Sequence, residues 1–132
     1  MSDPTDDKAI VLATNQSFYT AFSDCDLTAM RSLWWQGTTS LCIHPGSQPL
    51  VGWSEIEQSW SAIFRNTDAL EIDIEVLQLE VDRSLAYVVV KEIVLQANQG
   101  RRMKAQSIAT NVFQKMAQKW YLVNHHGSPI IR

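Results

Sequence analysis

The chain has 132 residues, of which 45% are hydrophobic and 19% are charged. This size and composition predict one compact domain, residues 1–132, that buries roughly two thirds of its unfolded surface. The net charge of −3 gives no basic field, so we expect no nucleic-acid partner. No apolar run approaches the roughly 20 residues of a membrane span, and the N-terminus is acidic where a signal peptide would be basic. We therefore expect no membrane partner and a cytoplasmic location.

The start of the chain carries two helical patterns. Asp3 followed by Pro4 matches the beginning of a helix, and an aromatic stripe at helical spacing continues it to about Ser23. Asp26 matches the N-cap of a short second helix. The two patterns predict a helical hairpin.

A short apolar strand over residues 40–43 follows and ends at His44, which opens a loop rich in proline. Ser54 and Glu57 then match a capping box. They predict a third helix that ends near Asn66.

From there the pattern changes to that of strands. Residues 71–76 alternate strictly, and the apolar set then moves to the opposite parity, which predicts a β-bulge near residues 76–77. Turn signals separate three further strands, over residues 85–96, over residues 103–115, and after a turn near residues 117–118. Three helices followed by antiparallel strands predict an α+β fold.

The strand over residues 85–95 is apolar on both faces. An antiparallel sheet with one wet face should alternate, so both faces of this strand need cover. Three helices cover only one face, and a second copy of the chain is the simplest cover for the other. We therefore expect a homodimer.

The last strand turns from apolar to polar at its end. With regular alternation, Asn124 and His126 share one face with Trp120, and His125 lies on the other face. Amide and imidazole groups where packing would favour Val or Ile indicate a small-molecule pocket. We expect His126 to be its titrating group, as a catalytic or a lining residue. The alternative is a structural histidine whose ring nitrogens are satisfied by hydrogen bonds within the fold.

Other candidates lie elsewhere in the chain. Glu92 shares a strand face with three valines, so it is either a buried base with a raised pKa or the partner of a cation across the sheet. His44 either lines the pocket rim or only holds its turn. We expect a small hydrophobic or amphipathic ligand, bound by Tyr19, Phe22, Trp34, His44, Trp60, Asn124 and His126.

Four stretches of the chain, residues 15–34, 42–46, 50–53 and 120–128, resemble the SnoaL-like proteins of the nuclear transport factor 2-like superfamily. The resemblance implies a cone-shaped, bent antiparallel sheet of four to six strands packed on three N-terminal helices, a fold also called cystatin-like. It further implies a pocket in the cone and, often, dimers through the sheet. Members include isomerases, dehydratases, cyclases and association domains, so the resemblance predicts a pocket and not a reaction.

The ending departs from the family pattern. Similar endings often read Val-His-x-His-x-Ser, and here Asn124 stands at the first histidine position. An amide does not transfer protons at neutral pH, so a mechanism with two histidines is not supported. Three functions remain open: a small-molecule-binding domain, an isomerase, cyclase or dehydratase acting through His126, and an oligomerisation module.

Neither metal nor cofactor binding is expected. The chain has no nucleotide-binding glycine motif and no zinc-protease motif, and Cys25 and Cys42 lack metal-site spacing. We expect both cysteines to be reduced structural thiols.

Overall fold

A computed structural model describes residues 4–131 of the chain. Three helices and six strands follow one another along it, in the order expected from the sequence except for the short strand at residues 50–51, which the sequence did not predict. They are α1 (Pro4–Ser23), α2 (Leu27–Leu33), β1 (Leu41–Ile43), β2 (Leu50–Val51), α3 (Trp53–Arg65), β3 (Ala69–Asp82), β4 (Leu85–Asn98), β5 (Arg101–Met116) and β6 (Lys119–Pro129).

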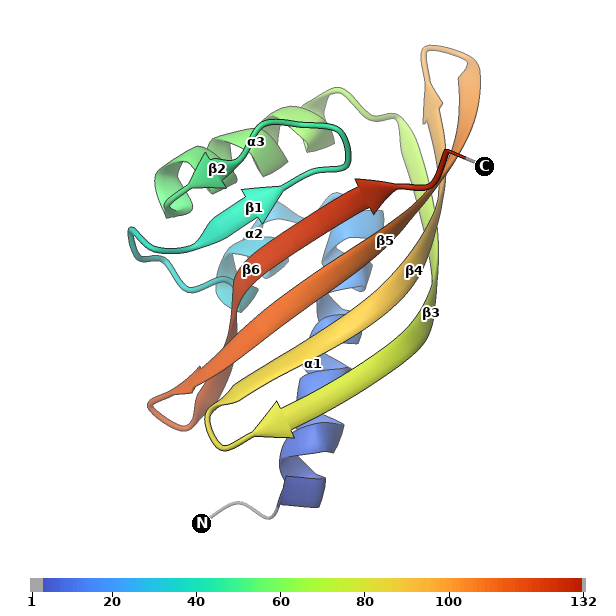
Figure 1. The fold of residues 1–132 in the computed structure, drawn as a ribbon. Coiled ribbons are helices and arrows are strands. Elements are labelled where there is room, and N and C mark those ends of the chain that lie inside the picture. The colour runs from blue at the N-terminus through green and yellow to red at the C-terminus, as the bar shows by residue number, and fades with distance from the viewer. Residues whose placement is uncertain (1–3, 132) are drawn as a thin grey trace.

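The six strands form one bent, unclosed sheet in the order β2-β1-β6-β5-β4-β3. Neighbouring strands are antiparallel except β1 and β6, which are parallel. The helices lie on one side of the sheet, with α1 along its concave face and α3 above one end (Figure 1). The predicted α+β architecture, with three helices on a bent antiparallel sheet, is confirmed.

The core lies between α1 and the concave face of the sheet. Phe18 of α1 is fully buried and makes edge contacts with the rings of Tyr19, Trp34 and Trp60. Such edge-to-face pairs add to the free energy gained by burying the rings. The aromatic stripe predicted for the first helix therefore forms the centre of the core.

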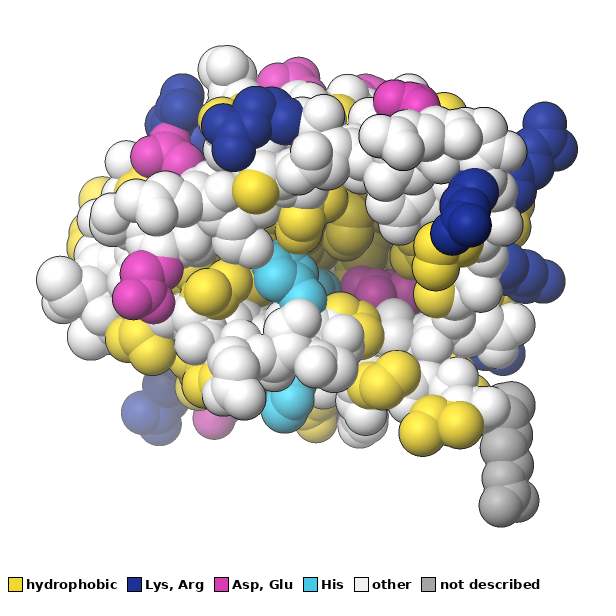
Figure 2. Space-filling model, turned by 90° about the horizontal axis from the view of Figure 1, so that it is seen from above, with side chains coloured by type: hydrophobic (Ala, Val, Ile, Leu, Met, Phe, Trp, Pro, Cys, Tyr) yellow, Lys and Arg dark blue, Asp and Glu magenta, His cyan; other side chains and the backbone are white. Residues whose placement is uncertain are grey.

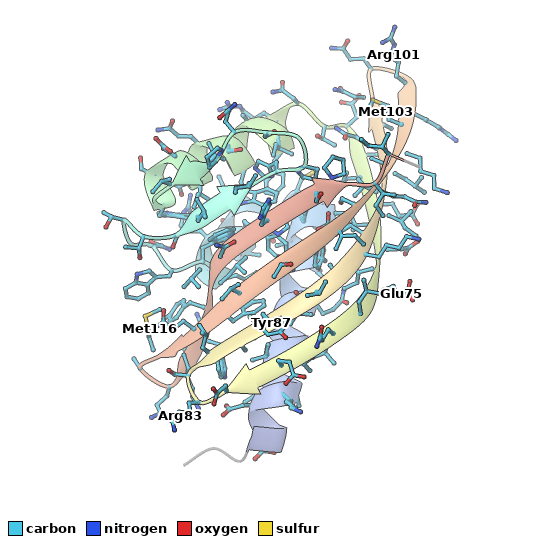
Figure 3. All side chains as sticks on the ribbon, viewed as in Figure 1. Glu75, Arg83, Tyr87, Arg101, Met103 and Met116 are labelled. Atoms are coloured by element: carbon cyan, nitrogen blue, oxygen red, sulfur yellow. The ribbon has the colours of Figure 1, made fainter. Side chains whose placement is uncertain are left out.

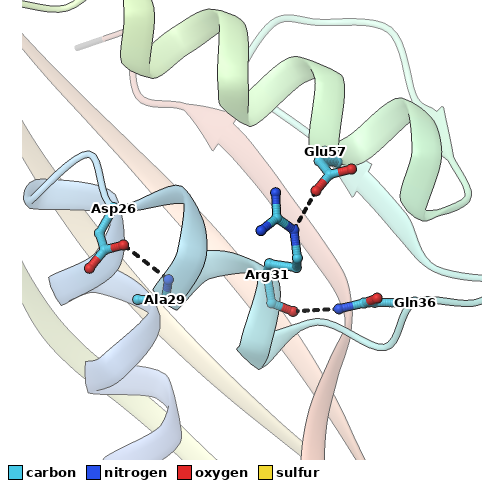
Figure 4. A network of polar contacts seen from close by, with 5 residues as sticks. All are labelled: Asp26, Ala29, Arg31, Gln36 and Glu57. Atoms are coloured by element: carbon cyan, nitrogen blue, oxygen red, sulfur yellow. Dashed lines mark hydrogen bonds and ion pairs between the residues drawn. The ribbon is translucent and has the colours of Figure 1, made fainter.

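Two of the three predicted helix starts can be compared with the structure. Asp26 caps α2 by accepting a hydrogen bond from the backbone N–H of Ala29 at 3.0 Å, as predicted (Figure 4). The predicted capping box of Ser54 and Glu57 is wrong, because α3 begins at Trp53 and no side chain caps it. Glu57 instead forms an ion pair with Arg31 of α2. The capping role predicted for Asp3 lies outside the described residues.

The bend in β3 has the predicted cause. Its pairing with β4 shifts between Val76 and Gln78, so Leu77 is an additional residue on β3. An extra residue on one strand of a pair is a β-bulge, which bends the strand. The bulge predicted near residues 76–77 is confirmed.

A second bulge lies in β6, and the sequence pattern did not reveal it. Pairing with β5 skips Val123, so that His125 follows Leu122 on the concave face. His125 is only 1% exposed, whereas His126 is exposed. The prediction that Asn124 and His126 share a face with Trp120 is therefore wrong: Trp120 is buried on the concave side, and Asn124 and His126 belong to the outer face.

Among residues 4–131, no helix is both long enough and apolar enough to cross a membrane.

Candidate functional site

A cavity of about 590 Å³ opens at the end of the fold where α3 faces the β4–β5 hairpin. Figure 2 shows it as a hollow, with histidine and acidic side chains at its floor among hydrophobic ones. The apolar part of its lining comes from α1, α3 and three long strands, and includes Phe22, Ile63, Leu70, Val94 and Ala105. Its volume lies within the range of roughly 300–1,000 Å³ found for small-molecule sites.

Glu92 of β4 lies at the floor of this cavity and is 2% exposed. The hydroxyl of Tyr19 donates to its Oε2 at 2.5 Å, and the hydroxyl of Ser107 donates to its Oε1 at 2.6 Å. Burial raises the pKa of the Glu92 carboxyl, and the two donated hydrogen bonds oppose that rise. A carboxylate held this way can accept a proton or a further hydrogen bond from a molecule in the cavity.

A chain of hydrogen bonds leads from Glu92 to His125. The amide nitrogen of Asn111 donates to the Tyr19 hydroxyl oxygen at 3.1 Å and to Oδ1 of Asn15 at 2.9 Å. Oδ1 of the same amide faces Nδ1 of His125 at 2.5 Å. These five side chains come from α1, β4, β5 and β6, so the network joins the helix to the sheet beneath the cavity.

The two histidines of the floor are neutral near pH 7. Burial lowers the pKa of His125 to about 3, with the nearby His126 adding to the effect. Burial lowers the pKa of His44 to about 4, and His125 lowers it further while Glu92 acts in the opposite direction. The neutral form of each ring has one donor and one acceptor nitrogen.

His44 is held by the loop after β1 and by α3. Its Nε2 lies 2.9 Å from the Ser59 hydroxyl oxygen, and its ring meets that of Trp60 edge-on at 4.9 Å between centroids. The Sγ of Cys42 lies 3.8 Å from the same nitrogen. Burial raises the pKa of the Cys42 thiol to about 12, so the thiol stays protonated. Cys42 and Cys25 are both free cysteines.

The structure separates the residues that the sequence singled out. Phe22 and His44 line the cavity. Tyr19 lies behind its floor and reaches it through Glu92. Trp34 and Trp60 are buried in the core, where Trp60 supports His44.

Asn124 and His126 do not line the cavity. The prediction that His126 is the titrating group of the pocket rested on a face assignment that the structure corrects. His125, which we expected on the outer face, occupies the place predicted for His126.

Sequence reasoning missed the polar residues that hold Glu92, His125 and His44, and also the other polar residues of the lining, Asn66, Thr67, Gln96, Asn98 and Gln106. Ser107 and Asn111 are buried on the same face of β5 as Ala109 and Phe113. Alternation with these two residues would have placed both side chains inward. Ser59 is on the helix turn beside Trp60, and no sequence pattern marked it.

Across the described part of the chain, 4–131, no three His, Cys, Asp or Glu side chains form a group that could hold a metal ion.

The chain is similar to known proteins over most of its length. It is 26% identical to the F-box protein SKIP8 of Arabidopsis thaliana, over 92% of this chain and 50% of that protein, so it spans about half the length of that relative. It is 28% identical to a candidate dehydratase of the NTF2-like family from Streptomyces avermitilis, with a TM-score of 0.91 over 98% of this chain and 100% of that one.

A third relative is a candidate association domain of calcium/calmodulin-dependent protein kinase type II from Thiobacillus denitrificans. The identity is 25% and the TM-score 0.80, over 89% of this chain and 93% of that one. The family model of the SnoaL-like domain matches residues 11–132, nearly the whole chain. The chain therefore belongs to the SnoaL-like domain family, within the NTF2-like superfamily.

Proposed function

We propose that the chain binds a small, largely apolar molecule in its cavity and holds the polar end of that molecule at Glu92. One observation carries the proposal: a buried carboxylate lies at the floor of a cavity of about 590 Å³ whose walls are mostly apolar. A buried carboxylate costs several kcal/mol unless other groups compensate it. The partners of Glu92 are two hydroxyl groups. A ligand that bonds to Glu92 would offset the remaining cost.

Binding can be tested with the fluorescent probe N-phenyl-1-naphthylamine, whose emission rises in an apolar site. We expect saturable binding to the wild-type chain. Ala105→Trp should abolish it, because Ala105 lines the cavity and a large ring there would fill the space. The matched control is Gln114→Trp, at an exposed position on the same strand far from the cavity. Equal binding by both variants would contradict the proposal.

A second candidate function is the dehydration of a β-hydroxy carbonyl compound. The raised pKa of Glu92 favours it, since a general base works best when its pKa lies near the operating pH. Glu92 would take a proton from the carbon between the carbonyl and the carbinol, and the hydroxyl group would leave with that proton as water. The similarity to a candidate dehydratase supports this function. Glu92 would then take the role that we expected of His126.

The second candidate is tested with 4-hydroxy-4-phenylbutan-2-one, whose dehydration to the conjugated enone is followed by ultraviolet absorption. We expect Glu92→Gln to slow enone formation by about a hundredfold or more, because an amide cannot accept the proton. Glu57→Gln, in the half-exposed ion pair with Arg31, is the control and should keep the wild-type rate. A wild-type rate no higher than that of Glu92→Gln would rule out this reaction.

We also propose a homodimer through the outer face of the sheet. Tyr87, Val89, Lys91 and Ile93 of β4 lie on that face, Tyr87 exposed and the other three half-buried, and they alternate with the inward Ala86, Val88, Val90 and Glu92. Figure 3 shows Tyr87 on the side of the sheet away from α1. An exposed apolar patch on an otherwise covered sheet marks an interaction surface. The relative named as an association domain supports an oligomer of this fold. If no ligand is found, this surface favours the third alternative, an oligomerisation module.

A further inference from the structure

We infer that the cavity floor selects ligands whose polar end donates hydrogen bonds, an amine or an alcohol, because Asn111 holds His125 with its acceptor nitrogen toward the cavity. The inference rests on the proposed ligand binding and narrows its chemical class. Four steps carry it.

The first step concerns the hydroxyl groups at Glu92. We take Glu92 in the ionised form, in which it has no proton to give and accepts from both Tyr19 and Ser107, the directions that these two hydrogen bonds have. Both hydroxyl protons are therefore committed to the carboxylate. Neither is available to donate to a ligand.

The second step fixes the orientation of Asn111. Since the Tyr19 hydroxyl donates to Glu92, its oxygen must accept from its other neighbour, and that neighbour is the amide nitrogen of Asn111. The second proton of this nitrogen goes to Oδ1 of Asn15. The amide oxygen is left facing His125.

The third step fixes the tautomer of His125. Nδ1 lies at hydrogen-bond distance from the Asn111 oxygen, which only accepts, so Nδ1 must carry the proton. The ring is neutral, and Nε2 is then an acceptor. His125 lines the cavity, and the hydrogen bond of its ring to the described residues is the one at Nδ1. We infer that Nε2, on the other side of the ring, is the atom that meets a ligand donor.

The fourth step is the comparison of ligand classes. The two fixed groups of the floor, Glu92 and His125, both accept. His44 can adapt, because the Ser59 hydroxyl at its Nε2 can donate or accept. Amide donors, Gln96 among them, line the cavity at other residues. A ligand carbonyl or carboxylate placed at Glu92 and His125 would set its oxygen against two acceptors and leave buried groups unpaired. An amine or alcohol would satisfy them, and an ammonium group would also balance the Glu92 charge.

The first experiment uses ligands with one scaffold and different polar ends: 2-naphthylmethylamine, 2-naphthalenemethanol, 2-acetylnaphthalene and 2-naphthoate. Calorimetric titration of the full chain should show the amine and the alcohol binding at least about tenfold more tightly than the ketone and the carboxylate. If the amine binds more tightly than the alcohol, the charge of Glu92 is the main attraction. If the two bind equally, hydrogen bonding is the main attraction. Either result supports the inference. A ketone or carboxylate that binds as tightly as the alcohol overturns it while the proposed function stands.

The second experiment reads the tautomer directly. The ¹⁵N chemical shifts of the histidine rings distinguish a proton on Nδ1 from one on Nε2, and we expect His125 to carry it on Nδ1 in the wild-type chain without ligand. Asn111→Leu should allow the other tautomer and reduce the preference for the amine and the alcohol. Asn124→Leu, an amide on the outer face, is the matched control and should change neither. A wild-type His125 protonated on Nε2 overturns the inference whether or not Asn111→Leu folds. If no ligand of the series binds, the proposed function and the proposed ligand class are both wrong. The tautomer of His125 is measured in either case.

Discussion

At the scale of single residues, the site joins groups whose pKa values burial moves in opposite directions. Burial raises the pKa of the Glu92 carboxyl and lowers those of His44 and His125 to about 4 and about 3. In each case burial disfavours the charged form. The floor therefore keeps its imidazoles neutral at neutral pH, which limits them to hydrogen bonding and excludes them as cationic partners of Glu92.

These shifts predict how stability depends on pH. A histidine with a lowered folded-state pKa contributes stability that is present above its ordinary value of 6.5 and lost as the pH falls toward 4. Glu92, whose pKa is raised, opposes this loss as it takes up a proton. Because two histidines act against one carboxyl, the free energy of unfolding should fall when urea denaturation is repeated from about pH 7.5 to about pH 4.5.

Two histidine variants test which side chains cause this dependence of stability on pH. His44→Gln should flatten the pH dependence, since it removes one of the two buried imidazoles. His126→Gln should keep most of it, because that side chain is exposed on the outer face. A curve for His44→Gln as steep as that of the wild-type chain would mean that His44 is not protonated on unfolding.

At the scale of elements, the loop after β1 rests on β6. A Cβ added at Gly127 would lie 2.7 Å from Cγ and 2.8 Å from Cδ of Pro45. A proline ring cannot rotate out of the way, so the whole loop would have to move, and it carries His44 at the cavity floor. Gly127 is thus needed for close contact between a strand and a loop.

Gly127→Ala should therefore lower the free energy of unfolding by about 1–3 kcal/mol, the usual range for overpacking. It should also weaken binding of the naphthylamine probe, because His44 would be displaced. Ser128→Ala, at the exposed neighbouring position, should change neither. Chemical denaturation and fluorescence titration of both variants check this, and an unaltered Gly127→Ala would show that the loop yields without cost.

Strand β6 also contains the feature of the site that the sequence did not predict. Helical spacing, the Asp26 cap and the parity switch near residue 76 predicted the three helices, the long strands and the bend of β3, because each leaves a mark in the pattern, whereas the two-residue β2 was not predicted. The bulge in β6 leaves none, since Leu122 and Val123 are both apolar and either could face inward. The extra residue, Val123, therefore reverses the faces that regular alternation predicts for His125 and His126. Glu92 lies on the face predicted for it, because the pairing of β4 with β5 is continuous and contains no bulge.

At the scale of the whole molecule, the two faces of the sheet differ in what covers them. The concave face packs on α1 and, toward one end, borders the cavity. The outer face of β4 and β5 carries the apolar side chains Tyr87, Val89, Ile93, Ile108 and Val112, with Lys91 among them opposite Ile108, and no helix of the described chain covers it. Edge strand β3 borders this face with exposed carboxylates, including Glu75. A mostly apolar surface with a charged border is the usual arrangement of a protein interface.

The homodimer predicted from this surface should appear in light scattering as twice the 15.0 kDa mass of one chain. Val89→Lys should shift the mass toward that of the monomer, because it adds a second cation beside Lys91 on this face, and desolvating an unpaired charge costs several kcal/mol. Ser84→Lys, in the exposed turn before β4, adds the same charge outside the patch and should leave the dimer intact. A wild-type mass of 15.0 kDa at micromolar concentration, or a Val89→Lys variant that stays dimeric, would show that this face is not the interface. Probe binding by the Val89→Lys monomer would then decide whether the cavity needs the partner, and since its lining comes from one chain, we expect binding to persist.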